Sequence, residues 1–250
     1  MSKQFRSGGR SLPVKNFYYL KRNLFLELFS SKVLKSSKLS RFDTFYVDLK
    51  NKIRYGPEAP RYAERIWVEP KQCTRYLPHD FSKQIFGKSK RKASGKVVES
   101  RWPLEQAKPI FNLPKVKFCI EHWTQNIPWE DTGLYDFMEN HIREHGSIDG
   151  CYDLKDIKKR YEYLDRVFDQ VKAEGRFRTR EEIKPGNYLE KDGIIIHVGP
   201  EGEPFFSRGG NHRFAMAWAL NLIFPAQIGC VHISAIPFLK NFRNKGLTAR

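Results

Sequence analysis

The sequence predicts a mixed α+β fold, and three observations support this prediction. Short apolar runs typical of strands occur at Ile194–Val198, Phe205–Phe206 and Ala226–Ile233. A helical pattern lies between the last two runs, at about residues 211–222, and ends before Pro225. A longer helical pattern covers Asp153–Glu174. Strands and helices that alternate over so short a stretch favour a small mixed sheet with helices packed on it.

The pattern over Asp153–Glu174 indicates the clearest helix of the chain. Asp153 is suited to cap its first turn, with Asp156 at the spacing of a capping box. Gly175 provides a C-terminal stop, because glycine readily adopts the left-handed conformation that ends many helices. Apolar residues recur at steps of three and four: Ile157, Tyr161, Leu164, Phe168 and Val171.

Weaker patterns predict the remaining elements. They are a helix at about residues 16–35, strands at Thr44–Leu49, Ile53–Tyr55, Arg65–Val68 and Lys115–Ile120, and a helix from Thr132 to about Glu144. His141 and His145 are one turn apart on that last helix, but no third metal ligand accompanies them. Trp123 and Trp129 precede it and either line a pocket or pack in the core.

Composition narrows the class of protein. The chain has 250 residues, of which 40% are hydrophobic and 14% aromatic, enough for a folded core. Its four cysteines are scattered without a CxxC pair, which argues against a zinc ribbon and a disulfide-rich secreted domain, and favours the reducing cytoplasm. No apolar stretch approaches the 18 residues of a membrane-spanning helix.

The net charge of +17 is concentrated in the first part of the chain. Residues 1–100 hold 23 Lys and Arg against 8 Asp and Glu, whereas residues 101–250 hold 22 against 20. Residues 87–96 are expected to form an exposed basic loop. Such a region attracts polyanions, either nucleic acid or an anionic membrane surface. A basic surface that serves only solubility is the alternative.

The most informative motif is Gly209-Gly210-Asn211-His212-Arg213, which lies between a strand and a helix. Glycines at such a junction allow a tight turn whose amides can face an anion, and the helix start adds partial positive charge. Arg208 and His212 add donors, and Arg213 can offer a planar fork to a phosphate. The motif therefore predicts a phosphate cradle; a plain tight turn is the alternative.

The same motif resembles the ParB/sulfiredoxin-like superfamily, in which a related turn handles the phosphates of ATP or CTP. The likeness covers roughly residues 155–236. It implies a nucleotide-binding domain at 153–236. Composition divides the rest into a basic N-terminal region at 1–100, an aromatic and acidic connecting segment at 101–152 that is expected to pack on the core, and a basic tail at 237–250. Sulfiredoxins carry a cysteine nucleophile where this chain has Asn211, so sulfinic-acid reduction is not expected. Cys230 falls in an apolar strand and is expected to be a buried hydrophobe.

Three functions remain open on these residues. The first is a nucleotide-dependent phosphotransferase or hydrolase, which usually needs Mg²⁺ held by one or two carboxylates. Its general base would be a carboxylate, and four are candidates by residue type alone: Glu130, Asp131, Glu181 and Glu182. The second is a DNA-associated ParB-like nucleotide-binding protein or nuclease, although no helix-turn-helix is recognisable after the motif. The third is a non-catalytic nucleotide sensor or scaffold.

Overall fold

The fold was analysed in a computed structural model that describes residues 41–78, 80–88, 91–185, 189–191 and 193–248. The chain divides between Lys38 and Leu39, and all described residues belong to the second part. The helix expected at residues 16–35 lies outside the described residues.

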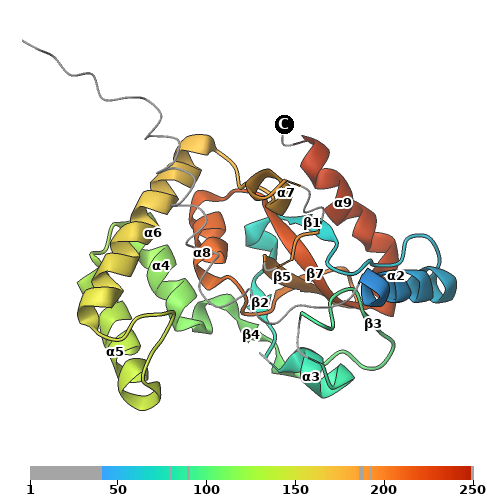
Figure 1. Cartoon of the computed structure of the whole chain (residues 1–250), viewed down its shortest axis with the longest axis horizontal. Coiled ribbons are helices and arrows are strands. Elements are labelled where there is room, and N and C mark those ends of the chain that lie inside the picture. Colours follow the sequence, from blue (N-terminus) through green and yellow to red (C-terminus); the bar gives the residue numbers. More distant parts are fainter. Residues whose placement is uncertain (1–40, 79, 89–90, 186–188, 192, 249–250) are drawn as a thin grey trace, which may run out of the picture. The chain divides into compact units, whose positions relative to one another are not determined.

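A mixed sheet forms the centre of this part (Figure 1). Its strand order is β1-β7-β5-β6-β2-β4, and β3 also pairs with β7. The long strand β7 runs parallel to β5 and β3 and antiparallel to β1. The strands are β1 (Arg65–Val68), β2 (Arg75–Tyr76), β3 (Val97–Val98), β4 (Lys108–Pro109), β5 (Ile194–Val198), β6 (Pro204–Phe206) and β7 (Phe224–His232).

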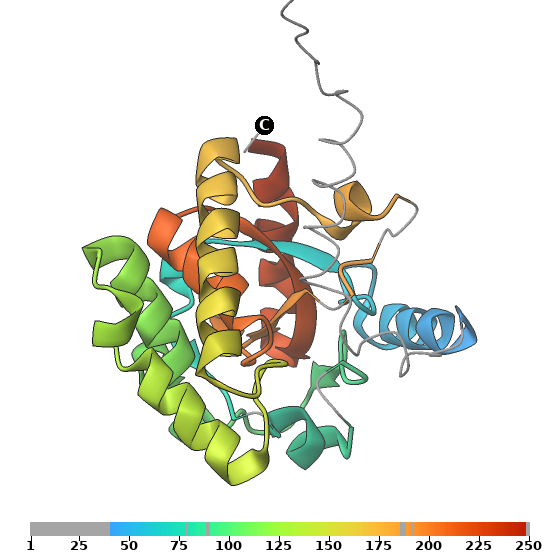
Figure 2. The same cartoon turned by 60° about the vertical axis from the view of Figure 1, so that its left-hand side comes forward.

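Helices cover the sheet in layers (Figures 1 and 2). The helix α8 packs against β5, and α4 and α6 pack on α8 from outside. On the other side α9 packs against β1, and α2 lies at the edge of the fold opposite α4 and α5 in both views. The helices are α2 (Arg41–Tyr55), α3 (Phe81–Phe86), α4 (Pro114–Gln125), α5 (Leu134–His145), α6 (Leu154–Glu174), α7 (Arg180–Ile183), α8 (Asn211–Leu220) and α9 (Leu239–Thr248).

The predicted elements around the motif are confirmed. The strands β5, β6 and β7 and the helix α8 occur in the expected order, and Cys230 is fully buried in β7. In α6 the side chain of Asp153 accepts a hydrogen bond of 2.8 Å from the amide of Asp156. Gly175 ends α6 in the left-handed conformation. The α+β class is thus confirmed.

Three strands predicted from short apolar runs are wrong, because those residues form helices. Thr44–Leu49 and Ile53–Tyr55 both lie in α2, and Lys115–Ile120 lies in α4. Pro114 occupies the first turn of α4, where its missing amide hydrogen costs nothing. The buried side chains of α4 follow at helical steps, and they are Val116, Cys119 and Ile120. Runs of four to six apolar residues do not distinguish a strand from a buried helical turn.

The division of the chain at residue 100 is also corrected. The strands β1, β2 and β3 pair with β7 and β6, so residues 65–98 belong to the same sheet as the motif. Residues 237–250 were expected to be a tail, yet most of them form α9, with Leu239 and Phe242 buried. The loop at 87–96 is exposed only in part. Ser94 is buried and its hydroxyl bonds the carbonyl of Ile228, while a Cβ on Gly95 would lie 2.6 Å from the carbonyl oxygen of Arg61.

Candidate functional site

The predicted cradle is a sharp turn between β6 and α8. The amide of Ser207 bonds the carbonyl of Ile195 at 3.1 Å, which carries the sheet ladder one residue past β6. The chain then reverses through Arg208 and Gly210, which have φ angles of 60° and 80°. A Cβ at Gly210 would lie 3.2 Å from the side chain of Ile194. The turn therefore favours glycine at this position for both backbone conformation and space.

The first turn of α8 lacks the capping side chain and the acidic residue that often stabilise a helix start. Gly210 is the N-cap and has no side chain to accept bonds from the first amides. No acidic residue occupies the first turn, and the first helical bond is made by Phe214, whose amide donates to the carbonyl of Gly210 at 2.9 Å. Gly210 itself is exposed, so this positive end of the helix dipole opens toward solvent.

His212 points from this turn into the layer of helices. Its Nε2 lies 3.0 Å from the hydroxyl of Tyr161 in α6 and 4.0 Å from Oδ2 of Asp149. The ammonium of Lys115 in α4 donates to the same Asp149 oxygen at 2.5 Å. The positive charge of Arg160 also acts on this group. His212 thus sits beside the ion pair of Lys115 and Asp149 and a further cation, Arg160.

Burial lowers the pKa of His212 to about 3, and the nearby cations Arg160 and Lys115 act in the same direction against the attraction of Asp149. His212 is therefore neutral at pH 7. Burial also raises the pKa of Tyr161 far above its ordinary value, so its hydroxyl keeps its proton. The tautomer of the neutral ring sets which of the Tyr161 hydroxyl and Nε2 donates in the bond between them. In the tautomer protonated on Nδ1, the ring can donate one hydrogen bond from that atom.

Arg213 lies in a second group of charges, with the buried residues Arg180 and Glu190. Glu190 is fully buried, and its Oε2 accepts bonds from Nε of Arg65 at 3.0 Å and from the amide of Arg180 at 3.2 Å. Arg65 also lies 3.5 Å from Glu181, whose side chain is 46% exposed. The buried carboxylate of Glu190 thus binds the Arg65 guanidinium and the Arg180 amide, and its charge acts on Arg213.

Arg213 keeps its charge in this group. Burial lowers its pKa to about 10, repulsion from Arg180 adds to the effect, and attraction to Glu190 acts in the opposite direction. Arg213 therefore remains protonated at neutral pH. An anion bound beside Arg213 and Arg180 would lessen the repulsion between them.

The carboxylates predicted as general bases are not brought together. Glu182 completes a capping box with Thr179 and pairs with Arg176 at 2.7 Å, which assigns it a structural role. Glu130 and Asp131 are exposed on the short helix η4 (Trp129–Asp131), next to α5. Of the four candidates, Glu181 is the one connected to Glu190, because Arg65 forms an ion pair with each of them. Arg208 is exposed, with its guanidinium 5.8 Å from the ring centroid of Tyr76.

Sequence reasoning missed most of the side chains around His212 and Arg213. These are Arg65, Lys115, Asp149, Arg160, Arg180 and Glu190, and Tyr161 was assigned only to the core stripe of α6. They come from five separate segments, so no local spacing could connect them. Trp123 and Trp129 line no open site: both indoles donate to the carboxylate of Asp165 at 2.9 Å.

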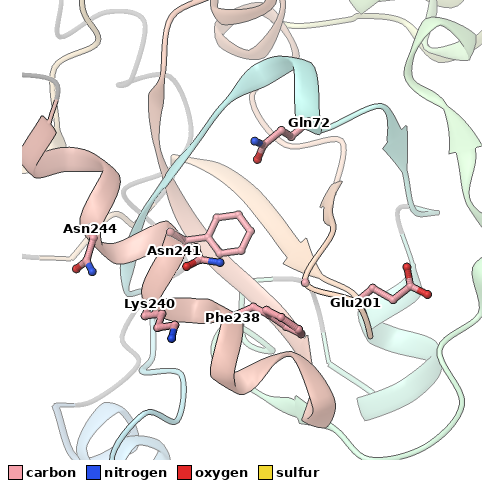
Figure 3. A pocket seen from close by; sticks show the side chains of 8 residues that line it. Gln72, Glu201, Phe238, Lys240, Asn241 and Asn244 are labelled. Atoms are coloured by element: carbon pink, nitrogen blue, oxygen red, sulfur yellow. The ribbon is translucent and has the colours of Figure 1, made fainter.

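A surface hollow of about 620 Å³ lies away from this site (Figure 3). Its walls come from the β5–β6 turn, the short helix η1 (Pro70–Gln72), the end of η5 (Ile233–Phe238) and α9. The labelled side chains Gln72, Glu201, Phe238 and Asn241 face it. The β5–β6 turn and the Gly210 turn lie at opposite ends of the same hairpin, so the hollow is separate from the predicted cradle.

Among the described residues, no group of three or more His, Cys, Asp or Glu side chains is placed to hold a metal ion. His141 and His145 stack on each other, with ring centroids 4.2 Å apart. No described helix has the length and apolar character needed to cross a membrane.

Comparisons with protein-family models, with curated proteins and with solved structures give no match. The likeness of residues 209–213 to the ParB/sulfiredoxin-like turn therefore stays a prediction from the residues themselves.

Proposed function

We propose that this chain binds a nucleoside triphosphate, ATP or CTP, with its phosphates at the first turn of α8. The observation that carries the proposal is the charged Arg213 in the first turn of a helix whose start has no capping side chain, with the buried Arg180 acting on it. Like charges held together at such a place are stabilised by a bound anion. The resemblance to the ParB/sulfiredoxin-like turn supports a nucleotide as that anion.

The two neighbours in the motif would have different roles. Arg213 would supply charge and a planar fork of donors to a phosphate. His212, neutral and bonded to Tyr161, would supply a single donor from Nδ1. Asn211 would contribute its backbone amide, together with those of Gly209 and Gly210.

Isothermal titration calorimetry with ATP, CTP and GTP, with and without Mg²⁺, tests the proposal. Arg213→Ala should weaken the best binder by about 1.5–3 kcal/mol, which is roughly 10- to 150-fold. Arg178→Ala is the matched control, because Arg178 pairs with Glu174 on the surface two residues from Arg180. Inorganic triphosphate should compete with the nucleotide. Equal binding by wild type and Arg213→Ala, or no binding by wild type, would refute the proposal.

An enzyme with this site would turn over the bound nucleotide as a phosphotransferase or a hydrolase. Glu181 is the carboxylate we select as the base, because it is partly exposed and lies near Arg65 beside the arginine group. Glu181→Gln should abolish turnover of the bound nucleotide and leave its affinity unchanged. Turnover that appears only with added DNA would favour a DNA-associated protein, and binding without turnover in either condition would favour a sensor.

A further inference from the structure

The helix α2 exposes a row of large apolar side chains at the edge of the fold. Phe45, Tyr46, Leu49 and Ile53 lie within two turns, with exposed fractions of 67%, 67%, 44% and 77%. Residues four apart share a helix face, so three of them form one continuous stripe. We call these four residues the α2 outer face. An exposed apolar row of this size marks an interaction surface more often than a lone exposed residue does.

Polar contacts on the opposite side of α2 fix this orientation. The amide of Asn51 is buried and donates to the carbonyls of Pro60 and Gly95, both at 2.7 Å. The carboxylate of Asp48 accepts a bond of 2.6 Å from the amide of Tyr62. These contacts tie the polar side of the helix to the segments that precede β1 and β3, and the apolar side faces outward. In most surface helices the apolar side faces the protein instead.

Basic side chains lie on α2 and near it. Lys50 lies on α2, while Lys88 and Lys96 come from the chain between α3 and β3. Lys96 is placed with its ammonium 5.0 Å from the ring centroid of Phe86. Its pKa is lowered by burial and by the positive charges of Lys88 and Lys50, so the three lysines are close enough to repel one another. We call these residues the lysine cluster. Lys52 and Arg54 extend the charge along α2, and Arg54 pairs with Glu99.

We propose that the α2 outer face and the lysine cluster together dock the protein on an anionic membrane surface. Apolar side chains on one side of a helix enter the boundary between headgroups and acyl chains, while adjacent lysines contact anionic headgroups. The aliphatic side chains of Leu49 and Ile53 favour a membrane over a nucleic acid as the partner. Their contact with acyl chains is favourable, but they cannot stack on bases as aromatic rings do. A second copy of the chain is disfavoured, since it would bring two lysine clusters together. This site is independent of the proposed nucleotide site.

Vesicle sedimentation with the full-length chain tests the proposal. Wild type should bind vesicles of phosphatidylcholine with 30% phosphatidylserine and should bind vesicles of phosphatidylcholine alone far more weakly. The variant Phe45→Ser with Ile53→Ser should bind the anionic vesicles at least tenfold more weakly. Lys50→Gln with Lys88→Gln should lose about fivefold for each lysine at low salt, and high salt should weaken wild type in the same way.

Matched controls lie on the far side of the fold. Tyr152→Ser removes an aromatic side chain of similar exposure, and Lys155→Gln with Lys159→Gln removes two exposed lysines of α6. Both should bind as wild type does. The proposal is overturned if the Phe45→Ser with Ile53→Ser variant binds anionic vesicles as wild type does. It is also overturned if wild type binds duplex or single-stranded DNA and not the vesicles.

Discussion

The two sides of the first turn of α8 differ in how their charges are balanced. On the side of His212, Lys115 and Asp149 form an ion pair, and the histidine stays neutral. On the side of Arg213, the motif residue itself keeps its charge, next to Arg180 and Glu190. His212 is therefore neutral and Arg213 is charged, although further cations lie on both sides. Under the proposed function Arg213 would bind the anion, and His212 would help to hold the turn in place.

The largest expected effect is that of removing the charge of Glu190. Glu190→Gln should lower the free energy of unfolding by about 3–5 kcal/mol, because the Arg65 guanidinium and the Arg180 amide lose their buried charged acceptor. Urea unfolding measures the change. Glu181→Gln is the control and should cost at most about 1 kcal/mol, as expected for a partly exposed ion pair. Similar costs for the two variants would contradict the picture of a buried, charge-rich group around Glu190.

The next effect is a dependence of stability on pH through His212. The pKa of this residue is about 3 in the folded protein, below the value of about 6.5 in an unfolded chain. Between these values the unfolded state binds more protons, so stability is present above pH 6.5 and is lost as the pH falls toward 3. The expected loss is about 2–3 kcal/mol by pH 4.5, at about 1.4 kcal/mol per pH unit.

The contribution of His212 can be isolated by comparison with His212→Gln. Other groups titrate in both proteins, so the difference between their urea-unfolding curves from pH 7 to pH 4.5 reports this histidine. The variant should show a flatter decline. Parallel curves would mean that His212 is charged in the folded protein, and the distinction between the two sides of the turn would then fail.

A smaller effect is expected from Asp149→Asn on the side of His212. The change should cost about 1.5–3 kcal/mol, because the hydrogen bond with the Lys115 ammonium loses its charged acceptor. Asparagine tolerates the φ of 51° at this position, so the backbone adds little. Asp169→Asn, on the exposed surface of α6, should change stability by less than about 0.5 kcal/mol. A cost for Asp149→Asn above that of Glu190→Gln would reverse the comparison.

The smallest effect concerns Gly210, which joins the two sides. Gly210→Ala should cost about 1–2 kcal/mol for the left-handed conformation, plus the close contact with Ile194. Gly175→Ala is the matched control, since Gly175 is also left-handed but a Cβ there meets no atom within 4 Å. The difference between the two melting temperatures measures the contact alone. Equal shifts would show that Ile194 moves aside without cost.

The sequence by itself determined the local features of this protein. Asp153 and Gly175 set the ends of α6 through bonds within a few residues, and the glycines before Asn211 placed the turn and the start of α8. Such features can be predicted because their energetics depend on neighbouring residues. The α+β class followed from them. Short apolar runs have no comparable capping or turn residues at their ends. For this reason the sequence pattern predicts strands within α2 and α4.

Only the tertiary structure decided the charges around the motif and the exposed face of α2. Arg65 and Glu190 are 125 residues apart, and Asp149 meets Lys115 and His212 from other segments, so their pairing depends on the sheet and helix packing. The contacts of Asn51 and Asp48 with Pro60 and Tyr62 orient α2 so that its apolar residues are exposed. Burial and long-range charge interactions arise from packing, and the order of residues along the chain does not record them.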